Sequence, residues 1–257
     1  MPEFCTAERD GRVLTVTLNR PELLNALHPP AHLELERVWN EFEADPALWV
    51  AVVTGAGERA FCAGNDLKYQ AAGGRVAMPP SGFGGITARY DMVKPVIAAV
   101  NGVAMGGGFE IALACDLIVA SERAVFALPE PRVGLAALAG GIHRLPRQIG
   151  LKNAMGMLLT GRRVSAEEGL RLGFVNEVVP PGELAAAARR WADAICECAP
   201  LSVRASKEAA LRGLDAGSLR EAVEGRYEQM VAMVKSEDFV EGPRAFAEKR
   251  RPAWKGR

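Results

Sequence analysis

The sequence of 257 residues lacks several features that would by themselves assign it to a class of protein. No apolar run reaches about 18 residues, the length that a helix needs to cross a membrane. The 31 basic and 31 acidic residues cancel, so bulk charge favours neither a nucleic acid nor a membrane surface. We therefore expect no nucleic-acid partner and no membrane association, and any bound anion must be held by a local basic cluster.

Patterns for disulfide, redox, metal or secretion chemistry are missing as well. The five cysteines are an odd number without framework spacing, and Cys196 and Cys198 are one residue too close for a redox CxxC pair. His28 and His32 flank two prolines and are predicted at a helix start, and a packing or surface role is favoured for His143. The first residues have neither the basic nor the apolar part of a secretory signal. We expect free thiols, no metal and a cytoplasmic location.

The chain does contain β-branched runs that alternate with helical patterns, which favours an α/β fold with parallel pairing. An amphipathic helix is predicted over 31–44 and another helical stretch over 66–71. The glycine-, proline- and serine-containing segment 73–85 predicts a mobile surface loop that could cover a ligand site. The predicted strands are 14–18, 49–54, 95–100, 116–120, 124–128 and 175–179.

The texture of the sequence changes toward its end. Ser165-Ala166-Glu167-Glu168 has the spacing of a helix capping box, and beyond Pro181 the pattern is helical almost throughout. We expect an α/β core over residues 1–195 and a helical region over 196–257. Since no low-complexity linker separates the two, the helices should pack on the core or on another subunit.

The most informative segment begins with the apolar run 94–100 and continues through three glycines to Glu110. Consecutive glycines let the backbone approach a ligand and leave peptide N–H groups exposed. The helix predicted after Glu110 adds unpaired donors and a positive dipole end. Such a turn can hold a developing negative charge beside an acid/base group, as an active site requires.

A second carboxylate, Glu130, lies in a similar context between two prolines just past a predicted strand. Two carboxyls that converge on a pocket of low dielectric cannot easily both ionise, so one serves as acid and the other as base. The alternative interpretation makes Glu110 a partner of the helix dipole and Glu130 a solvated turn residue.

Another glycine-containing turn occurs upstream, at 61–67, between a predicted strand and a predicted helix. Its backbone N–H groups could form half of an oxyanion hole, and Gly107 could supply the rest. The alternative is an ordinary turn in which Asp66 caps the helix.

Taken together, these segments resemble the crotonase, or enoyl-CoA hydratase/isomerase, superfamily along essentially the whole chain. The motifs that carry the resemblance are Arg20-Pro21, Asn25-Ala26-Leu27, Thr54-Gly55, Phe61-Cys62-Ala63-Gly64-Asn65-Asp66-Leu67, Lys94 to Gly102, Gly106 to Glu110, Cys115-Asp116, Phe126 to Glu130, Thr160-Gly161 with Ser165-Ala166, and Glu241 to Arg250.

The resemblance implies a ClpP/crotonase-like spiral of ββα units followed by a helical trimerisation region. It also implies an acyl-CoA substrate whose thioester enolate is stabilised by the N–H groups of Asn65 and Gly107. The hydratase branch has two glutamates, which match Glu110 and Glu130, and this favours a hydro-lyase that adds water to a 2-enoyl-CoA. We assign Glu110 as the base on water and Glu130 as the acid at Cα, although the sequence leaves the division of proton roles open.

The resemblance further implies a homotrimer or a dimer of trimers, with no cofactor apart from the coenzyme A of the substrate. Phe246 and Lys249 can come from a neighbouring subunit, and Arg20 and Lys68 are further candidates for the phosphates. The residues expected to bind substrate or coenzyme A are Leu24, Ala26, Ala63, Gly64, Asp66, Leu67, Gly106, Pro129, Leu138, Phe246 and Lys249.

Three alternatives to a general enoyl-CoA hydratase stay open. Segments 106–113, 126–130, 236–238 and 254–257 look most similar to carnitinyl-CoA (crotonobetainyl-CoA) dehydratases. An enoyl-CoA isomerase needs only a proton shuttle and is disfavoured by the presence of both glutamates. RNA binding without catalysis, known among crotonase relatives, is disfavoured by the zero net charge.

Overall fold

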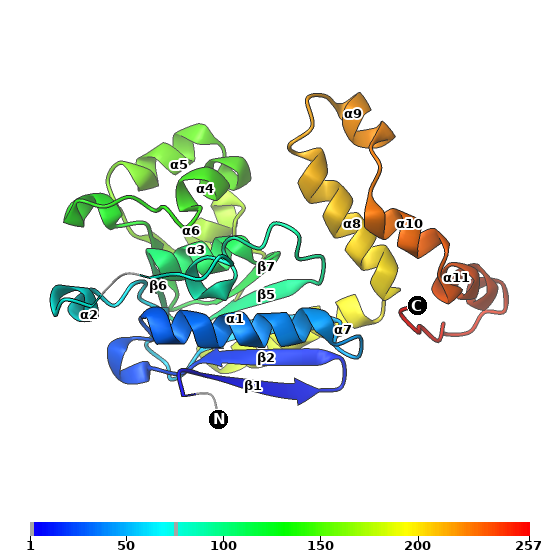
Figure 1. Ribbon diagram of the computed structural model, residues 1–257, viewed down its shortest axis with the longest axis horizontal. Coiled ribbons are helices and arrows are strands. Elements are labelled where there is room, and N and C mark those ends of the chain that lie inside the picture. Colours follow the sequence, from blue (N-terminus) through cyan, green and yellow to red (C-terminus); the bar gives the residue numbers. More distant parts are fainter. Residues whose placement is uncertain (1–2, 75–76) are drawn as a thin grey trace.

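The computed structural model describes residues 3–74 and 77–257. Within these residues the strands form two sheets (Figure 1). The larger has, in spatial order, β1 (Cys5–Asp10), β2 (Val13–Leu18), β3 (Val50–Gly55), β5 (Val96–Val100), β7 (Leu117–Ser121) and β10 (Glu177–Val179). The smaller has β4 (Ala60–Cys62), β6 (Val103–Met105), β8 (Val125–Ala127) and β9 (Val164–Ser165).

The chain alternates between the two sheets. β3, β5 and β7 of the large sheet are each followed directly by β4, β6 and β8 of the small one, and all of these pair in parallel. Among the described strands, antiparallel pairing occurs only at two edges, where β1 pairs with β2 and β9 with β8. This repeated strand–strand succession, with helices after β4 and β6, is the expected spiral of ββα units.

Helices cover both faces of the large sheet (Figure 1). In β3, Ala51 and Val53 face the core shared with α1 (Pro29–Ala44), whereas Val50 and Val52 face the cluster under α7 (Leu184–Cys196). Strands buried on both faces carry continuous apolar runs, which is why these strands could be read from the sequence.

The remaining helices lie above the small sheet or beyond the large one. Those near the small sheet are α2 (Leu67–Ala71), α3 (Gly107–Ala114), α4 (Gly141–Ile149), α5 (Leu151–Leu158) and α6 (Ala166–Leu172). Short 3₁₀ turns are η1 (Pro21–Leu23), η2 (Phe83–Gly85), η3 (Glu130–Val133) and η4 (Pro181–Glu183). The C-terminal arm, as we call residues 200–257, contains α8 (Pro200–Gly213), α9 (Leu219–Glu224), α10 (Glu228–Val234) and α11 (Glu237–Ala247).

The arm projects away from the sheets (Figure 1). Within it α8 packs on α10, and the chain end returns to α11, where Asp238 accepts from the N–H groups of Lys255 and Gly256. None of the helices in the described part of the chain is long and apolar enough to cross a membrane.

Two expectations need correction. The helix predicted to follow Glu110 begins three residues earlier, at Gly107, because the glycines themselves form its first turn. A Cβ on Gly108 would overlap the Cys62 carbonyl oxygen, so this close packing of α3 on β4 requires glycine.

Ser165 does cap α6 as the capping box predicts, by accepting from Glu168 N–H at 3.2 Å.

The second correction concerns the end of the predicted mobile loop over 73–85. Residues 75–76 lie outside the described part, but the end of the segment is buried against α1. The Gly84 N–H donates to His32 Nδ1 at 3.0 Å, and the Trp39 indole donates to the Gly84 carbonyl at 3.0 Å. Positive φ at Gly84 and Gly85 lets the chain wind this tightly onto the helix.

Candidate active site

Glu110 and Glu130 meet at the carboxyl ends of two neighbouring strands. Met105 of β6 pairs with Ala127 of β8, so the segments that follow each strand leave the sheet side by side. Glu110 lies in the first turn of α3 and Glu130 begins η3. A Cβ on Gly106 would stand 2.8 Å from Glu130 Oε1, so this glycine leaves room for the second carboxyl.

The Glu110 carboxyl is buried, with 3% of the residue exposed. Its Oε1 accepts from the Gly141 N–H at 2.8 Å, and the Ala139 N–H bonds to the same carboxyl. Burial and, to a smaller extent, the nearby charge of Glu130 raise the pKa of Glu110 to about 7 despite these donors. The group can therefore hold or release a proton near neutral pH.

The Glu130 carboxyl is half-buried and less well supported. Its Oε2 is buried and has no hydrogen-bond partner among the described residues. Burial raises the pKa of Glu130 as well. An oxygen without a donor favours the protonated carboxyl, so hydrogen bonding distinguishes the two glutamates.

Two backbone N–H groups next to the carboxyls are available to a ligand. The N–H groups of Asn65 and Gly107 donate to no acceptor within the described part of the chain. They are close together, since a Cβ on Gly64 would lie 3.2 Å from Gly107 N. The N-terminus of α3 adds its dipole at Gly107. Two such donors can together bind an oxyanion, as the donors of an oxyanion hole do.

The segments expected to bind coenzyme A run side by side. Ala63 N–H donates to the Leu24 carbonyl at 3.0 Å, and Leu27 N–H donates to the Gly64 carbonyl at 2.8 Å, with Ala26 between the two contacts. The buried Asn25 fixes this strand by donating to the Ala60 carbonyl at 2.8 Å. These neighbouring segments therefore form one wall beside Asn65.

Asp66 has a structural task in this wall. It caps α2 by accepting from Tyr69 N–H at 3.0 Å, and it pairs with Arg20 at 3.1 Å. The Arg20 guanidinium is largely buried in this pair, which leaves the exposed Lys68 as the better phosphate candidate. Leu67 is also exposed at the start of α2.

An apolar cavity of about 380 Å³ opens beside Glu130. Its walls come from the loop after η3 and from α4 and α5, and they include Ala137, Ile142, Pro146 and Met155. Leu138 lies on the same loop but is exposed. Glu130 is the one charged residue in this lining, and no aromatic side chain takes part in it, among the residues that the structure describes.

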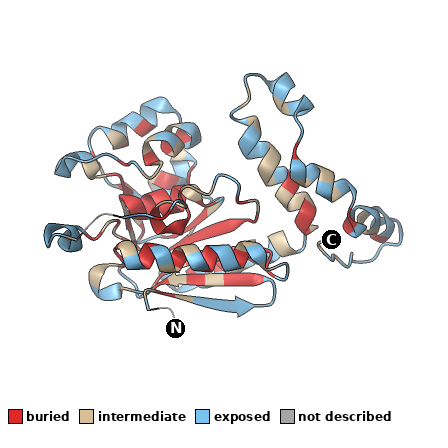
Figure 2. Cartoon of the chain, viewed as in Figure 1, coloured by how far each residue is buried: buried red, intermediate tan, exposed pale blue. Residues whose placement is uncertain are grey.

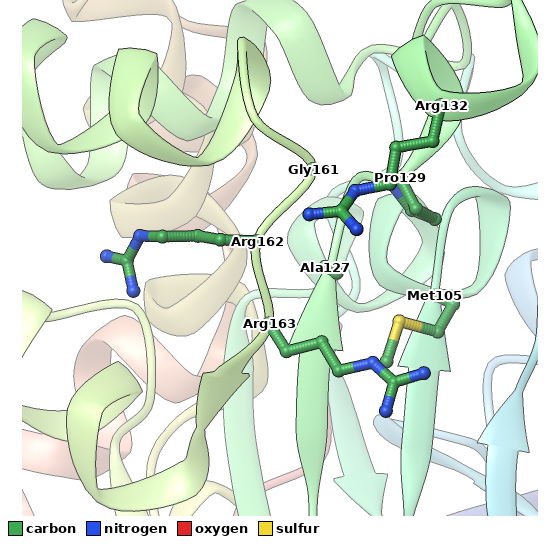
Figure 3. A pocket seen from close by; sticks show the side chains of 7 residues that line it. All are labelled: Met105, Ala127, Pro129, Arg132, Gly161, Arg162 and Arg163. Atoms are coloured by element: carbon green, nitrogen blue, oxygen red, sulfur yellow. The ribbon is translucent and has the colours of Figure 1, made fainter.

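A second cavity, of about 470 Å³, lies behind the strand ends and was not expected from the sequence (Figure 3). Met105 and Pro129, which directly precede Gly106 and Glu130, form part of its wall. Arg132 and Arg163 extend over the strand ends, whereas Arg162 points away and pairs with Glu168 at 2.8 Å.

Phe246 and Lys249 do not join the site within this chain. Phe246 lies in the last turn of α11 and Lys249 just beyond this helix, on the C-terminal arm and far from α2 and β6 (Figure 1). Phe246 is 87% exposed, and Lys249 adopts a positive φ of 54°. His143 is exposed on α4 and does not enter the cavity beside Glu130.

The site also contains contributors that sequence reasoning missed. The Ala139 and Gly141 N–H groups hold Glu110, and the Phe83 ring covers Gly107, where a Cβ would meet it at 2.5 Å. The paired glycines 140–141 were a visible signal for the first. Nothing in the sequence connects Phe83 with Gly107, because η2 reaches α3 only through the tertiary fold.

Comparison with known proteins defines the class to which this arrangement belongs. The profile described as "Enoyl-CoA hydratase/isomerase" matches residues 8–257. The chain belongs to the enoyl-CoA hydratase/isomerase family. The expected family, the crotonase fold and the hydro-lyase class are thereby confirmed.

Individual members of the family, and solved structures within it, are similar to this chain over nearly its whole length. The chain is 46% identical to a carnitinyl-CoA dehydratase of Proteus mirabilis, with 96% of each chain covered. It is 44% identical to the carnitinyl-CoA dehydratase of an Escherichia coli strain, with both chains fully covered. Among solved structures, an enoyl-CoA hydratase from Mycobacterium tuberculosis superposes with a TM-score of 0.92 at 40% identity, covering 99% of both chains.

Proposed function

We propose that this chain adds water reversibly across the 2,3 double bond of a 2-enoyl-CoA thioester. One observation carries the proposal: two carboxyls with raised pKa values stand beside two backbone N–H groups that have no acceptor among the described residues, at the same strand ends. The N–H groups of Asn65 and Gly107 bind the thioester oxygen and stabilise the charge that reaches it in the enolate. The carboxyls move the protons.

The hydrogen bonds support one division of the proton roles. Glu110 accepts two N–H groups, which favour its ionised form, so it takes a proton from water as the hydroxyl bonds to C3. Glu130, whose buried Oε2 has no donor in the described part of the chain, is the acid that protonates C2. The pair thus works with one proton between its members, and dehydration runs the same steps backwards.

We propose that the wall formed by Leu24, Ala26, Ala63, Gly64 and Leu67 binds the pantetheine and adenine part of coenzyme A. Phe246 and Lys249 would complete this site from the arm of a neighbouring copy in a trimer or dimer of trimers. Their distance from α2 within one chain supports that arrangement. The steps need no cofactor beyond the coenzyme A of the substrate, and we place the enzyme in the cytoplasm.

A second candidate substrate is crotonobetainyl-CoA, the hydration partner of carnitinyl-CoA, which the names of the relatives favour. A trimethylammonium group is normally met by aromatic faces or carboxylates. In the described chain the cavity beside Glu130 offers aliphatic walls and only the catalytic carboxyl. This lining favours an uncharged acyl chain.

The test is the loss of enoyl-thioester absorbance when purified protein meets crotonyl-CoA, with Glu110→Gln and Glu130→Gln beside the wild type. Each substitution should lower kcat by about 10²- to 10⁴-fold. Glu122→Gln, an exposed residue in the turn before β8, is the matched control and should be unaffected. A folded wild type that hydrates neither crotonyl-CoA nor crotonobetainyl-CoA would contradict the proposal, and full activity in one Gln variant would favour an isomerase.

A further inference from the structure

Arg144, which lies outside the expected site, contacts two segments that support the site. Arg144 of α4 donates from Nη1 to the Ala139 carbonyl at 3.3 Å and from Nη2 to the Thr87 carbonyl at 2.7 Å. Residues 139–141 form the turn whose N–H groups hold Glu110. Thr87 ends the segment 83–87, whose Phe83 ring covers Gly107.

The segment on the far side of this bridge is itself rigid. Thr87 Oγ1 accepts from Phe83 N–H at 2.8 Å, and the neighbouring Gly84 is hydrogen-bonded to α1 through His32 and Trp39. The guanidinium of Arg144 therefore connects the turn at 139–141 to a fixed point of the core.

The turn on the near side depends on glycine. Gly140 adopts φ 104°, and a Cβ at this position would overlap Arg144 Nη1. Thr87 is buried and α4 packs on α3, so the guanidinium is enclosed between the loop, the helix and the segment. The fork geometry of arginine suits two carbonyl acceptors at once, which an ammonium cannot reproduce.

We propose that Arg144 is a positioning residue for Glu110, which it serves by tying the turn 139–141 to the segment 83–87. The inference rests on the proposed function, in which Glu110 is the base on water. It predicts that both the geometry and the charge of the guanidinium act on that carboxyl.

The charges around the two groups are few. Glu110 is influenced by Glu130 and Arg144, and Arg144 by Tyr90, Glu110 and Cys115. The Tyr90 ring lies 5.8 Å from the guanidinium carbon. Burial raises the pKa of Glu110, and the positive charge of Arg144 lowers it. Removing the charge should therefore raise this pKa further.

The experiment compares Arg144→Met, which removes charge and fork, with Arg144→Lys, which keeps the charge alone. Arg147→Met is the matched control, since Arg147 lies on the same helix and its side chain is 60% exposed. Two readouts are taken: the pH titration of the Glu110 carboxyl in the infrared, with Glu110→Gln as the blank, and kcat and KM for crotonyl-CoA.

We expect Arg144→Met to shift the titration of Glu110 to higher pH and to lower kcat about tenfold or more, with KM little changed. Arg144→Lys should titrate like the wild type but recover only part of kcat, and Arg147→Met should match the wild type throughout. Arg144→Lys also keeps the test decisive if Arg144→Met does not fold.

Wild-type kcat in Arg144→Lys, or an unchanged titration and kcat in folded Arg144→Met, would overturn the proposal. Failure of the proposed function is seen separately, because a wild type without hydratase activity still gives the infrared titration. In that case an unmoved titration in Arg144→Met would overturn the positioning of Glu110, and a shifted one would support it.

Discussion

The core around the glutamates and the C-terminal arm differ in how closely they are packed and how far they are buried. In the core, strands and α3 are buried and backbone contacts leave no room even for a methyl group at Gly108 (Figure 2). The arm is mostly exposed and has many surface ion pairs, such as Arg220 with Glu224 at 2.9 Å. It also exposes large apolar side chains, including Leu214, Leu219, Val223, Val240 and Phe246.

The difference separates two requirements of the proposed reaction. Proton transfer and charge stabilisation need donors fixed within fractions of an ångström, and a close-packed core supplies that. Binding the far end of a large substrate needs an exposed surface and charged side chains. The arm has both, at a distance from the core of its own chain. In the proposed arrangement, one chain therefore holds all the groups of the chemical step, and a second copy completes its coenzyme A site.

The largest expected effect is on the kinetics of oligomers that combine two variants of the chain with different defects. Glu110→Gln removes the chemistry of a core, and a Phe246→Ala, Lys249→Ala double variant weakens binding through the arm. If the arm serves a neighbour, oligomers co-expressed from both should contain sites with an intact core and an intact arm. Such mixtures should contain sites that combine a wild-type kcat with a low KM for crotonyl-CoA, a combination that neither pure variant shows.

The outcome against this arrangement is equally plain. Mixtures whose kinetics equal the sum of the separate variants would show that each arm serves its own chain or none. Crotonyl-pantetheine is the control substrate, since without the adenosine part its KM should be insensitive to the arm substitutions.

Two glycine substitutions compare packing in the two regions. Gly108→Ala should cost about 3 kcal/mol or more of unfolding free energy, because the methyl group overlaps the Cys62 carbonyl oxygen. Gly213→Ala at the end of α8 meets Ala222 Cβ at 3.5 Å and the Tyr227 hydroxyl at 3.9 Å, both ordinary contacts, and should stabilise by about 0.5–1 kcal/mol. Denaturant unfolding of both measures the contrast, and equal costs would refute it.

The buried carboxyl predicts a trade between activity and stability. Because the folded-state pKa of Glu110 is about 7, above its ordinary 4.5, its contribution to stability is full at low pH and lost as the pH rises through 7. Glu110→Gln removes the charge and should be more stable than wild type by roughly 2–3 kcal/mol at about pH 8. The gain should vanish toward about pH 5, and a pH-independent gain would contradict the account.

The smallest effect belongs to the surface of the arm. Arg220→Ala breaks an ion pair whose side chains are mostly exposed, and it should change the unfolding free energy by less than about 0.5 kcal/mol. Thermal unfolding at low and high salt provides the measurement. A larger loss would mean that the arm is held more tightly than its exposure indicates.

The parts of the fold that the sequence predicted are those with a local cause. Apolar runs that are buried on both faces, such as 50–55 and 96–100, predict their strands, and Ser165 predicts the start of α6. β1, β4, β6 and β9 escaped prediction because they are very short or lie at an edge. β1 reads CTAERD, with one buried residue in six positions.

The candidate site divides in the same way. Glu110 behind its glycines and Glu130 between its prolines could be recognised from the sequence, and the family resemblance extended the set to Asn65. The Gly141 N–H that holds Glu110 lies 31 residues downstream, and the Thr87 carbonyl that holds Arg144 lies 57 residues upstream of it. Such contacts arise only when α4 closes over α3, and no local pattern encodes them.

The central claim, that Glu110 and Glu130 share one working proton, is tested most directly by the pH dependence of kcat/KM for crotonyl-CoA. The account predicts a bell, because activity is lost at low pH when both carboxyls are protonated and at high pH when both are ionised. Its two limbs should bracket the neutral range where the pKa of Glu110, about 7, lies. A flat profile through that range, in a wild type that hydrates the substrate, would contradict the shared proton.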